Sequence, residues 1–261
     1  MDLNLKDKVV IVTGGAKGIG EGIVRSFAAE NATVVIVNRS GGEGEELRDE
    51  LNKSGGKASF VKADLVDPLQ CKKAVEETLE QFGRIDVLVN NAGINDGASL
   101  ESGVEAFEQS LKNNVVHYYA MAHYALDALK KSKGNIINIG SKVADTGQGG
   151  TSGYAASKGA CNALTREWAV DLAPYSVRVN AVIPAEVMTP LYERWVATLP
   201  NPEETLKKIC DSIPFERRMT SKEEMADMVV FLASSRSSHT TGQIVYVDGG
   251  YTHLDRKCTL E

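Results

Sequence analysis

Short runs of apolar, mostly β-branched residues alternate with longer helical stretches along almost the whole chain. Several of these runs are apolar without alternation, which is typical of strands that are covered on both faces. Strands joined by crossover helices form a parallel sheet with helices on both sides. We therefore predict an α/β fold with a doubly wound, seven-stranded parallel sheet, whose strands lie at Val9–Thr13, Thr33–Asn38, Ser59–Lys62, Val87–Asn90, Asn135–Ile139, Val177–Val182 and Gln243–Val247.

One stretch, from about Pro184 to Ile213, breaks this rhythm with four prolines and a helical piece at Glu203–Asp211. It follows a strand, where an open sheet places its ligand crevice. A mobile substrate loop over residues 184–213 fits this position, and so does a plain surface insertion. No linker or repeat interrupts the rest, so residues 1–261 form a single predicted domain. Its expected helices lie near residues 19–30, 43–53, 68–82, 103–130, 154–172 and 222–234.

Composition excludes several classes of protein. The net charge of −6 argues against nucleic acid or an anionic membrane as the main partner. The four cysteines are far apart and form no CxxC pair, so we expect neither a disulfide framework nor a metal site. No apolar run approaches the ~20 residues of a membrane helix, and Met1–Lys8 is too polar for a secretory signal. A cytoplasmic protein with a small-molecule substrate is the expectation.

The glycine-rich segment Thr13–Gly20 follows the first strand directly and opens a helix. Gly14 permits a tight turn, Gly18 lets the backbone approach a pyrophosphate, and Gly20 lets helix and strand pack closely. The N–H groups at the start of the helix, with Lys17 and Ile19, then face the phosphates. In this β-α-β position the cluster predicts a dinucleotide site, the alternative being a structural turn.

The end of the second strand bears on the choice of cofactor. NAD sites usually carry an acidic side chain there, whereas this chain has Asn38 and Arg39. The planar donor fork of arginine suits the 2′-phosphate of NADP, and Lys17 adds a second positive charge. We predict that NADP is preferred. NAD remains possible if Arg39 stacks on adenine or is solvated.

Two further strand ends are candidates for cofactor contacts. Asp64, followed by Leu65, comes after the third strand and suits either a hydrogen bond from the adenine amino group or the cap of a turn. The fourth strand ends in Asn90 followed by Asn91, Ala92 and Gly93. Small residues here let the backbone pass close to the cofactor, while asparagine side chains tie neighbouring strands together.

Tyr154 and Lys158 are four residues apart in an expected helix, which puts both side chains on one face. An unperturbed tyrosine, with a pKa near ~10, is a poor base at neutral pH. A fixed ammonium group nearby favours the phenolate form. Tyr154 is therefore a candidate to exchange a proton with a substrate oxygen. The alternative is an ordinary surface pair.

Two more polar residues strengthen the catalytic interpretation. Ser141 comes just after the fifth strand, at the sheet edge where this fold presents its chemistry, and its hydroxyl suits a developing alkoxide. Asn114 lies inside the helix expected at 103–130, where asparagine is unfavourable. It is expected to bend the helix, or to hold a water that relays protons to Lys158, unless it is an ordinary exposed residue.

These motifs, taken together and in this order, resemble the short-chain dehydrogenase/reductase family from about Lys6 to Gly250. The resemblance implies a Rossmann-like domain that transfers a hydride between a nicotinamide dinucleotide and a carbonyl or alcohol. It also implies a homodimer or homotetramer formed through the helices at 103–130 and 154–172. The implied roles are acid/base for Tyr154, pKa modifier and ribose holder for Lys158, substrate orienter for Ser141 and water holder for Asn114.

The segment Pro184–Thr189 matches the family segment after the sixth strand. By that resemblance Pro184, the Val187 backbone and the Thr189 hydroxyl hold the carboxamide and a nearby phosphate. Ala185 stands where the family usually has glycine, which leaves the shape of this loop open.

Three stretches are also similar to L-fucose dehydrogenases and related sugar dehydrogenases: Gly147–Tyr154, Pro184–Tyr192 and Asp248–Arg256. Gln148 and Glu186 would then hydrogen-bond substrate hydroxyls, as would Ser141 and Tyr154. Gln148 and Glu186 are equally suited to be solvated loop residues. The prediction is an aldose 1-dehydrogenase. The alternatives are a 3-oxoacyl carrier-protein reductase and a non-catalytic, dinucleotide-binding regulatory protein.

Overall fold

The computed structural model describes residues 2–254, in which seven parallel strands form one sheet in the order β3-β2-β1-β4-β5-β6-β7. The predicted α/β class, strand number and parallel arrangement are confirmed. The chain first builds the sheet outwards from β1 and then returns to start β4 on its other side, which creates a crevice between β1 and β4 at their carboxyl ends. The strands are β1 (Val9–Thr13), β2 (Thr33–Asn38), β3 (Lys57–Lys62), β4 (Val87–Asn90), β5 (Asn135–Ile139), β6 (Arg178–Pro184) and β7 (Ile244–Val247).

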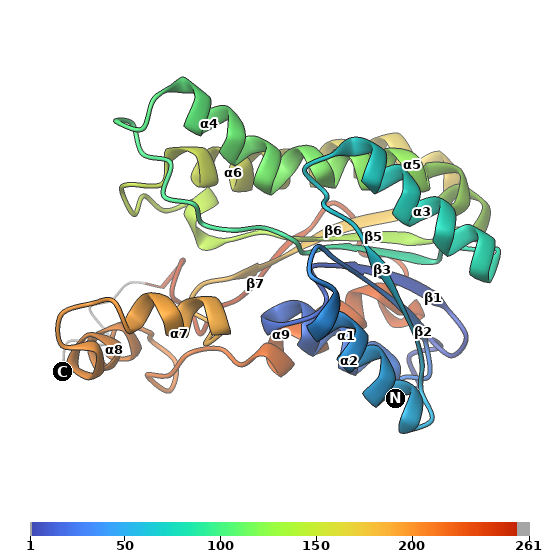
Figure 1. The fold of residues 1–261 in the computed structure, drawn as a ribbon, viewed down its shortest axis with the longest axis horizontal. Helices are drawn as coiled ribbons and strands as arrows, with labels where there is room; N and C mark the ends of the chain where they lie inside the picture. The colour runs from blue at the N-terminus through green and yellow to red at the C-terminus, as the bar shows by residue number, and fades with distance from the viewer. Residues whose placement is uncertain (1, 255–261) are drawn as a thin grey trace.

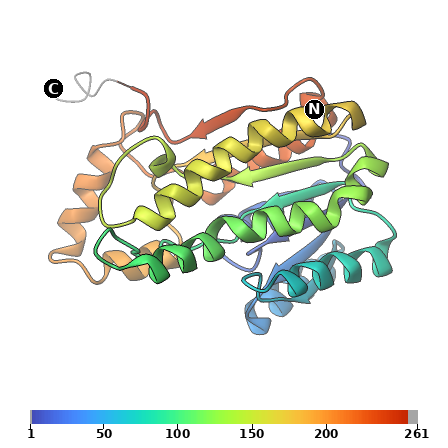
Figure 2. The same ribbon diagram turned by 90° about the horizontal axis from the view of Figure 1, so that it is seen from above.

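Helices cover both faces of the sheet (Figures 1 and 2). Asp67 caps the start of one of them, because its side chain accepts a hydrogen bond from Leu69 N at 2.9 Å and Pro68 occupies the first turn. One face carries α3 (Pro68–Phe82), α4 (Val104–Leu111), α5 (His117–Ser132) and α6 (Ser152–Leu172), and the other carries α1 (Gly18–Ala29), α2 (Gly41–Lys53) and α9 (Lys222–Ala233).

The core explains why the strand sequences do not alternate. In β1, Ile11 packs with the cluster under α3, α5 and α6, whereas Val10 and Val12 pack with the cluster under α1 and α9. All five residues of this strand are buried. Both faces of the central strands are therefore shielded from water, and each face requires apolar side chains.

The helix expected at 103–130 is interrupted by a π-helical turn, Lys112–Val116, between α4 and α5. Asn114 lies in this turn and is fully buried. Its amide nitrogen donates to Ser110 O at 3.0 Å, and its oxygen accepts from Ile94 N at 2.7 Å. The expected irregularity at Asn114 is thus a single, widened π-helical turn. Such turns within α-helices often occur at functional sites.

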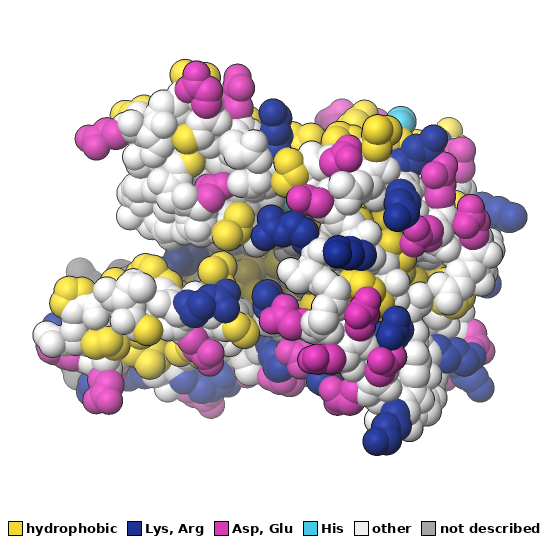
Figure 3. Space-filling view, in the orientation of Figure 1, with side chains coloured by type: hydrophobic (Ala, Val, Ile, Leu, Met, Phe, Trp, Pro, Cys, Tyr) yellow, Lys and Arg dark blue, Asp and Glu magenta, His cyan; other side chains and the backbone are white. Residues whose placement is uncertain are grey.

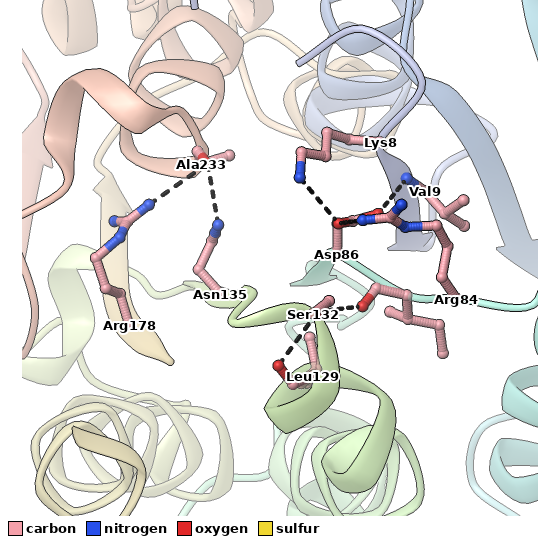
Figure 4. Close-up of polar contacts among 10 residues, drawn as sticks. Lys8, Val9, Arg84, Asp86, Leu129, Ser132, Asn135, Arg178 and Ala233 are labelled. Carbon is pink, nitrogen blue, oxygen red and sulfur yellow. Dashed lines mark hydrogen bonds and ion pairs between the residues drawn. The ribbon is translucent and has the colours of Figure 1, made fainter. Parts of the chain in front are cut away.

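The edge of the sheet where the strands begin is closed by contacts within the protein (Figure 4). Asp86 precedes β4 and accepts a hydrogen bond from Val9 N at 3.0 Å, while it also pairs with Lys8 at 3.2 Å and Arg84 at 2.6 Å. Nearby, Asn135 donates to the carbonyl oxygen of Ala233 at 3.0 Å. These contacts join the starts of β1, β4 and β5 to one another and to the end of α9.

The interruption predicted at residues 184–213 forms two short helices, α7 (Pro190–Val196) and α8 (Pro202–Asp211), which project beyond the carboxyl ends of the strands (Figure 1). The mobility of this insertion stays a prediction. Among residues 2–254, no helix has the length and apolarity to cross a bilayer, and no cluster of acidic, histidine or cysteine side chains could hold a metal ion. Arg256 and Cys258 lie outside the described residues.

Asp86 supplies the first stability prediction. Asp86→Ala removes the acceptor for Val9 N and the partner of two cations, but Lys8 and Arg84 are partly exposed and regain water. We expect the free energy of unfolding to fall by about 2 kcal/mol, as for a lost buried hydrogen-bond hub. Urea denaturation followed by circular dichroism measures it. A loss below about 0.5 kcal/mol would contradict the role of Asp86.

A second prediction concerns His117, which is buried beside the π-turn. Its Nε2 lies 3.0 Å from Asn113 O and must carry the proton, whereas its buried Nδ1 has no partner. Burial lowers the pKa of His117 to about 4, aided by the ammonium group of Lys158. The unfolded chain, with a histidine pKa near ~6.5, therefore binds a proton that the folded chain does not. Stability should fall as the pH drops from about 6.5 to about 4.

His117→Gln removes this titration. The slope of the unfolding free energy against pH should therefore decrease over that window, by an amount equivalent to the uptake of up to one proton. Denaturant titrations at several pH values provide the measurement, with the exposed His239→Gln as the matched replacement. An unchanged slope in His117→Gln would show that other groups control acid stability.

Candidate active site

The glycine turn after β1 has the form of an anion cradle. Gly14 and Gly18 both adopt positive φ angles, of 63° and 59°, which glycine reaches without strain. A Cβ atom on Gly20 would lie 2.2 Å from Gly14 O, so no side chain fits there. Lys17, at the start of α1, makes no capping hydrogen bond with its side chain. The N–H groups of Gly18, Ile19 and Gly20 are therefore available to a phosphate.

The end of β4 is fastened to this turn by hydrogen bonds. Asn91 Nδ2 donates to Thr13 O at 2.9 Å and to Gly14 O at 3.2 Å. In return, Thr13 Oγ1 accepts from Asn91 N at 2.9 Å and Ala92 N at 3.1 Å. Asn90, the last residue of β4, donates through its Nδ2 to Asn138 Oδ1 in the neighbouring β5 at 3.0 Å. The crevice between β1 and β4 thus has rigid walls.

The residues assigned to the adenosine end lie near the ends of β2 and β3. Arg39 is exposed at the end of β2, and Lys17 forms an exposed ion pair of 2.8 Å with Glu43 in α2. Asn38 Nδ2 donates to Ser40 O at 3.2 Å. Asp64 Oδ1 accepts from Val66 N at 3.2 Å, so the turn-capping alternative is the contact that the structure contains. Leu65 is buried beside it.

Lys158 is buried, with only 3% of its surface exposed, and its ammonium group is held from two sides. It donates to Ile139 O at 2.8 Å and to the Tyr118 hydroxyl at 3.1 Å, and it lies 5.6 Å from the centre of the Tyr154 ring. Burial alone would lower the pKa of Lys158, but the two neighbouring phenols outweigh it and raise the pKa above its ordinary value. The group therefore stays an ammonium ion at neutral pH.

Tyr118 is a site residue that sequence reasoning missed. It is fully buried in α5, and its hydroxyl donates to the same Ile139 carbonyl at 3.0 Å. Burial raises the pKa of Tyr118 to about 12, which keeps its proton in place. Its position one helical turn after Asn114 was the available signal, because residues four apart share a helix face.

Gly93 connects Asn114 with Lys158. A Cβ atom on Gly93 would lie 3.0 Å from Asn114 Oδ1 and 3.7 Å from Lys158 Nζ. The carboxamide of Asn114 also holds the following residue, Ile94, through its N–H. Backbone therefore occupies the space next to the lysine, and a side chain at position 93 would crowd it.

Ser141 and Tyr154 lie on separate elements at the carboxyl edge of the sheet. Ser141 follows β5 and begins the short 3₁₀ turn Lys142–Ala144, with its Oγ 3.5 Å from Val143 N. Tyr154 lies in the first turn of α6, which packs along that 3₁₀ turn. The start of α6 is fixed because Gly153 N donates to Ala98 O at 3.1 Å.

The two predicted substrate residues have different surroundings. Gln148 is exposed. Glu186, two residues after β6, forms an ion pair with Lys142, which was not among the predicted site residues. The side chain of Glu186 is 12% exposed and that of Lys142 is 11% exposed. Tyr192 in α7 hydrogen-bonds to the same carboxylate, and burial together with Glu186 raises its pKa.

The predicted carboxamide and phosphate segment lies where β6 leaves the sheet. Pro184 ends β6, Val187 is buried and pairs with Thr220, and Thr189 begins α7. A Cβ atom on Gly18 would lie 3.2 Å from Thr189 Cγ2, so Thr189 borders the glycine turn. Ala185 does not require a positive φ angle, which explains why alanine replaces glycine there without strain.

Figure 3 shows the molecule hollowed between the part that carries α4 and the start of α6 and the part that carries α7 and α8. This cleft opens at the carboxyl edge of the sheet. The structure thus brings the glycine turn, the Tyr154–Lys158 helix and the Glu186 segment to one edge, opposite the closed polar edge of Figure 4.

Comparison with known proteins agrees with this geometry. A family profile described as enoyl-(acyl carrier protein) reductase matches residues 14–252. An L-fucose dehydrogenase of Bos taurus is 39% identical over 93% of this chain and 88% of the relative. A 3-oxoacyl-acyl-carrier-protein reductase of Thermotoga maritima is 35% identical over 95% of this chain and 99% of the relative. The crystal structure of Cj0485 dehydrogenase, 48% identical and 98% covered in both chains, superposes with a TM-score of 0.94. The chain is a member of the short-chain dehydrogenase/reductase family, an oxidoreductase that acts on CH–OH groups with a nicotinamide dinucleotide.

Proposed function

We propose that this oxidoreductase oxidises the C1 hydroxyl of an aldose such as L-fucose to a lactone, with NADP as its preferred cofactor. The observation that carries the chemistry is the buried Lys158 ammonium group, held beside Tyr154 at the carboxyl edge of the sheet. The sugar is supported by similarity to an L-fucose dehydrogenase over most of both chains. The partly buried Lys142–Glu186 pair also suits hydroxyl groups better than an alkyl chain.

The residues present fit a dinucleotide. The glycine turn leaves uncapped N–H groups at the start of α1, and no side chain would fit at Gly20. When bound, the nicotinamide accepts the hydride from the substrate carbon. The residues proposed to hold the cofactor are Gly14, Lys17, Gly18, Ile19, Gly20, Asn38, Arg39, Asp64, Leu65, Asn91, Ala92, Gly93, Tyr154, Lys158, Pro184, Val187 and Thr189.

In this proposal the phenolate of Tyr154 takes the proton from the substrate hydroxyl as hydride leaves the same carbon. The positive charge of Lys158, which the Ile139 carbonyl and Tyr118 hydroxyl fix in position, lies beside the Tyr154 ring. The hydroxyl of Ser141 donates to the substrate oxygen and orients it. Asn114 fixes the backbone next to Lys158. In this proposal it also holds the water through which protons return.

The preference for NADP rests on charge at the end of β2. Arg39 is exposed there, and Lys17 makes a surface ion pair with Glu43 that an incoming phosphate can replace. An exposed pair of this kind contributes little to stability, so it opens at small cost. A 2′-phosphate between Arg39 and Lys17 would gain charge-assisted hydrogen bonds that NAD cannot make.

The rival function, reduction of 3-oxoacyl groups on a carrier protein, has its own support in the Thermotoga maritima relative. An acidic carrier protein requires a basic surface near the cleft. In the basic doublet at 217–218, however, Arg218 is already paired with Glu216 and Glu224, both at 2.7 Å. A purely regulatory protein would not need Ser141, Tyr154 and Lys158 together.

A homodimer or homotetramer is part of the proposal. Trp168 and Ala169 of α6 are buried in the core and face the sheet. Tyr119 of α5 and Val170 of α6 are instead 57% and 74% exposed, which suits a contact with a second subunit. A cytoplasmic location is proposed with it, on the strength of the reduced cysteines expected from their spacing.

The test of the mechanism is Tyr154→Phe, which keeps the ring and removes the acid/base. We expect kcat for L-fucose oxidation to fall at least about 1000-fold, within the range for loss of a general acid/base. Binding of NADPH, followed by its fluorescence, should change less than about threefold. Tyr175→Phe, at a surface tyrosine, is the matched control. Substantial turnover by Tyr154→Phe would exclude Tyr154 as the base.

The test of cofactor choice is Arg39→Ala. Losing a charge-assisted contact to the 2′-phosphate should raise KM for NADP by about 10- to 100-fold and leave KM for NAD within about threefold. Steady-state kinetics with both cofactors measure this difference. Arg48→Ala, at a partly exposed arginine of α2 that pairs with Asp49, controls for loss of positive charge. Equal losses with both cofactors would contradict recognition of the phosphate.

A further inference from the structure

Two side chains of opposite charge meet where β5 and β6 end. Lys142 is the residue directly after Ser141, and Glu186 follows the end of β6 by two residues. The two strands are neighbours in register, with Ile139 opposite Val182, so the segments that follow them are adjacent. The Lys142 ammonium group and the Glu186 carboxylate form an ion pair whose side chains are 11% and 12% exposed.

Two tyrosines from other segments complete the cluster. The Tyr192 hydroxyl, from α7, hydrogen-bonds to Glu186. The Tyr251 ring, from the segment after β7, lies 4.0 Å from Lys142 Nζ and makes a cation–π contact. The insertion therefore contacts the carboxylate of the pair through Tyr192, and the segment after β7 contacts the ammonium group through Tyr251.

The location of this pair distinguishes it from the structural charges of the fold. Asp86, at the opposite edge, accepts the backbone N–H of Val9 and joins two strands. Removing two charges from water is unfavourable, and an ion pair recovers that cost only in part. A partly buried pair one residue from Ser141, surrounded by two aromatic rings, is therefore better explained by ligand recognition than by stability.

We propose that Lys142 and Glu186 form a hydroxyl-recognition subsite that binds two adjacent hydroxyl groups of the sugar, with Tyr192 and Tyr251 as its walls. This inference rests on the proposed function. An ammonium group only donates hydrogen bonds and a carboxylate only accepts them. A hydroxyl does both, so it can bridge the pair by donating to Glu186 and accepting from Lys142.

A second, neighbouring hydroxyl can donate to the other carboxylate oxygen, which makes a vicinal diol the ligand that satisfies both charges. A substrate that lacks one of these hydroxyls leaves a charged group without its hydrogen bond. Sites built in this way discriminate strongly against the analogue that lacks the group. Lys142 is therefore assigned as a specificity-determining residue together with Glu186.

The experiment compares L-fucose with its monodeoxy analogues, using the wild-type protein, Lys142→Met and Glu186→Gln. For two analogues, each lacking one of two adjacent hydroxyls away from C1, wild-type kcat/KM should be at least about 100-fold below that for L-fucose. In both variants this difference in kcat/KM should shrink to less than about threefold, because each variant removes one charge of the pair and with it the charge-assisted hydrogen bonds to the hydroxyl. Variants that keep the wild-type ratio for every analogue would overturn the proposal.

The matched controls are Lys72→Met and Glu76→Gln, which break an exposed lysine–glutamate pair of 3.5 Å on α3, away from the cleft. These variants should keep the wild-type ratio. Thermal unfolding checks that the site variants are folded; if Lys142→Met does not fold, the nearly isosteric Glu186→Gln still decides the question.

Saturation-transfer NMR of L-fucose with the NADP-loaded protein separates this inference from the proposed function. Sugar turnover with an unchanged ratio in both variants would retain the function and exclude the subsite. Sugar binding that is lost in Glu186→Gln, without turnover in the wild type, would retain the subsite and exclude the function. Absence of both binding and turnover of polyhydroxy compounds would overturn both.

Discussion

The arrangement of the site depends on the buried ammonium group of Lys158. A charge in the interior is tolerated only where hydrogen bonds replace the lost water, and here the Ile139 carbonyl at 2.8 Å and the Tyr118 hydroxyl at 3.1 Å provide them. These partners belong to β5 and α5, whereas the lysine belongs to α6. One charge therefore fixes three elements relative to one another. Tyr154, one turn earlier in α6, is held at the carboxyl end of β5 as a consequence.

The two edges of the sheet use polar residues in opposite ways. At the amino edge, polar side chains hydrogen-bond to the backbone of neighbouring elements and so join these elements (Figure 4). Asp86 accepts from Val9 N, while Asn135 and Arg178 donate to carbonyl oxygens at the end of α9. At the carboxyl edge the glycine turn leaves N–H groups uncapped. Because parallel strands all end at the same edge, segments far apart in sequence can contribute to a single cleft there.

The sequence predicted most of the fold because strands covered on both faces must be apolar throughout, as β1 is. The structure begins β3 at Lys57 and extends β6 to Pro184, so the strand limits differed by no more than two residues. Contacts between segments far apart in the chain were harder to predict from the sequence. Tyr118 offered only its spacing of four residues from Asn114, and Lys142 carries no local motif; their importance becomes clear from the residues that the fold places next to them, namely Lys158 and Glu186.

Glu186 illustrates how such a contact changes the interpretation of a residue. As an isolated carboxylate it was a candidate for hydroxyl binding, but the structure shows that Lys142 and Tyr192 already occupy it. A ligand must therefore replace existing hydrogen bonds rather than fill free ones. A hydroxyl can do so at little net cost because it both donates and accepts. An alkyl group cannot, and would leave the pair desolvated without compensation. The pair thus favours polyhydroxy ligands partly through what it excludes.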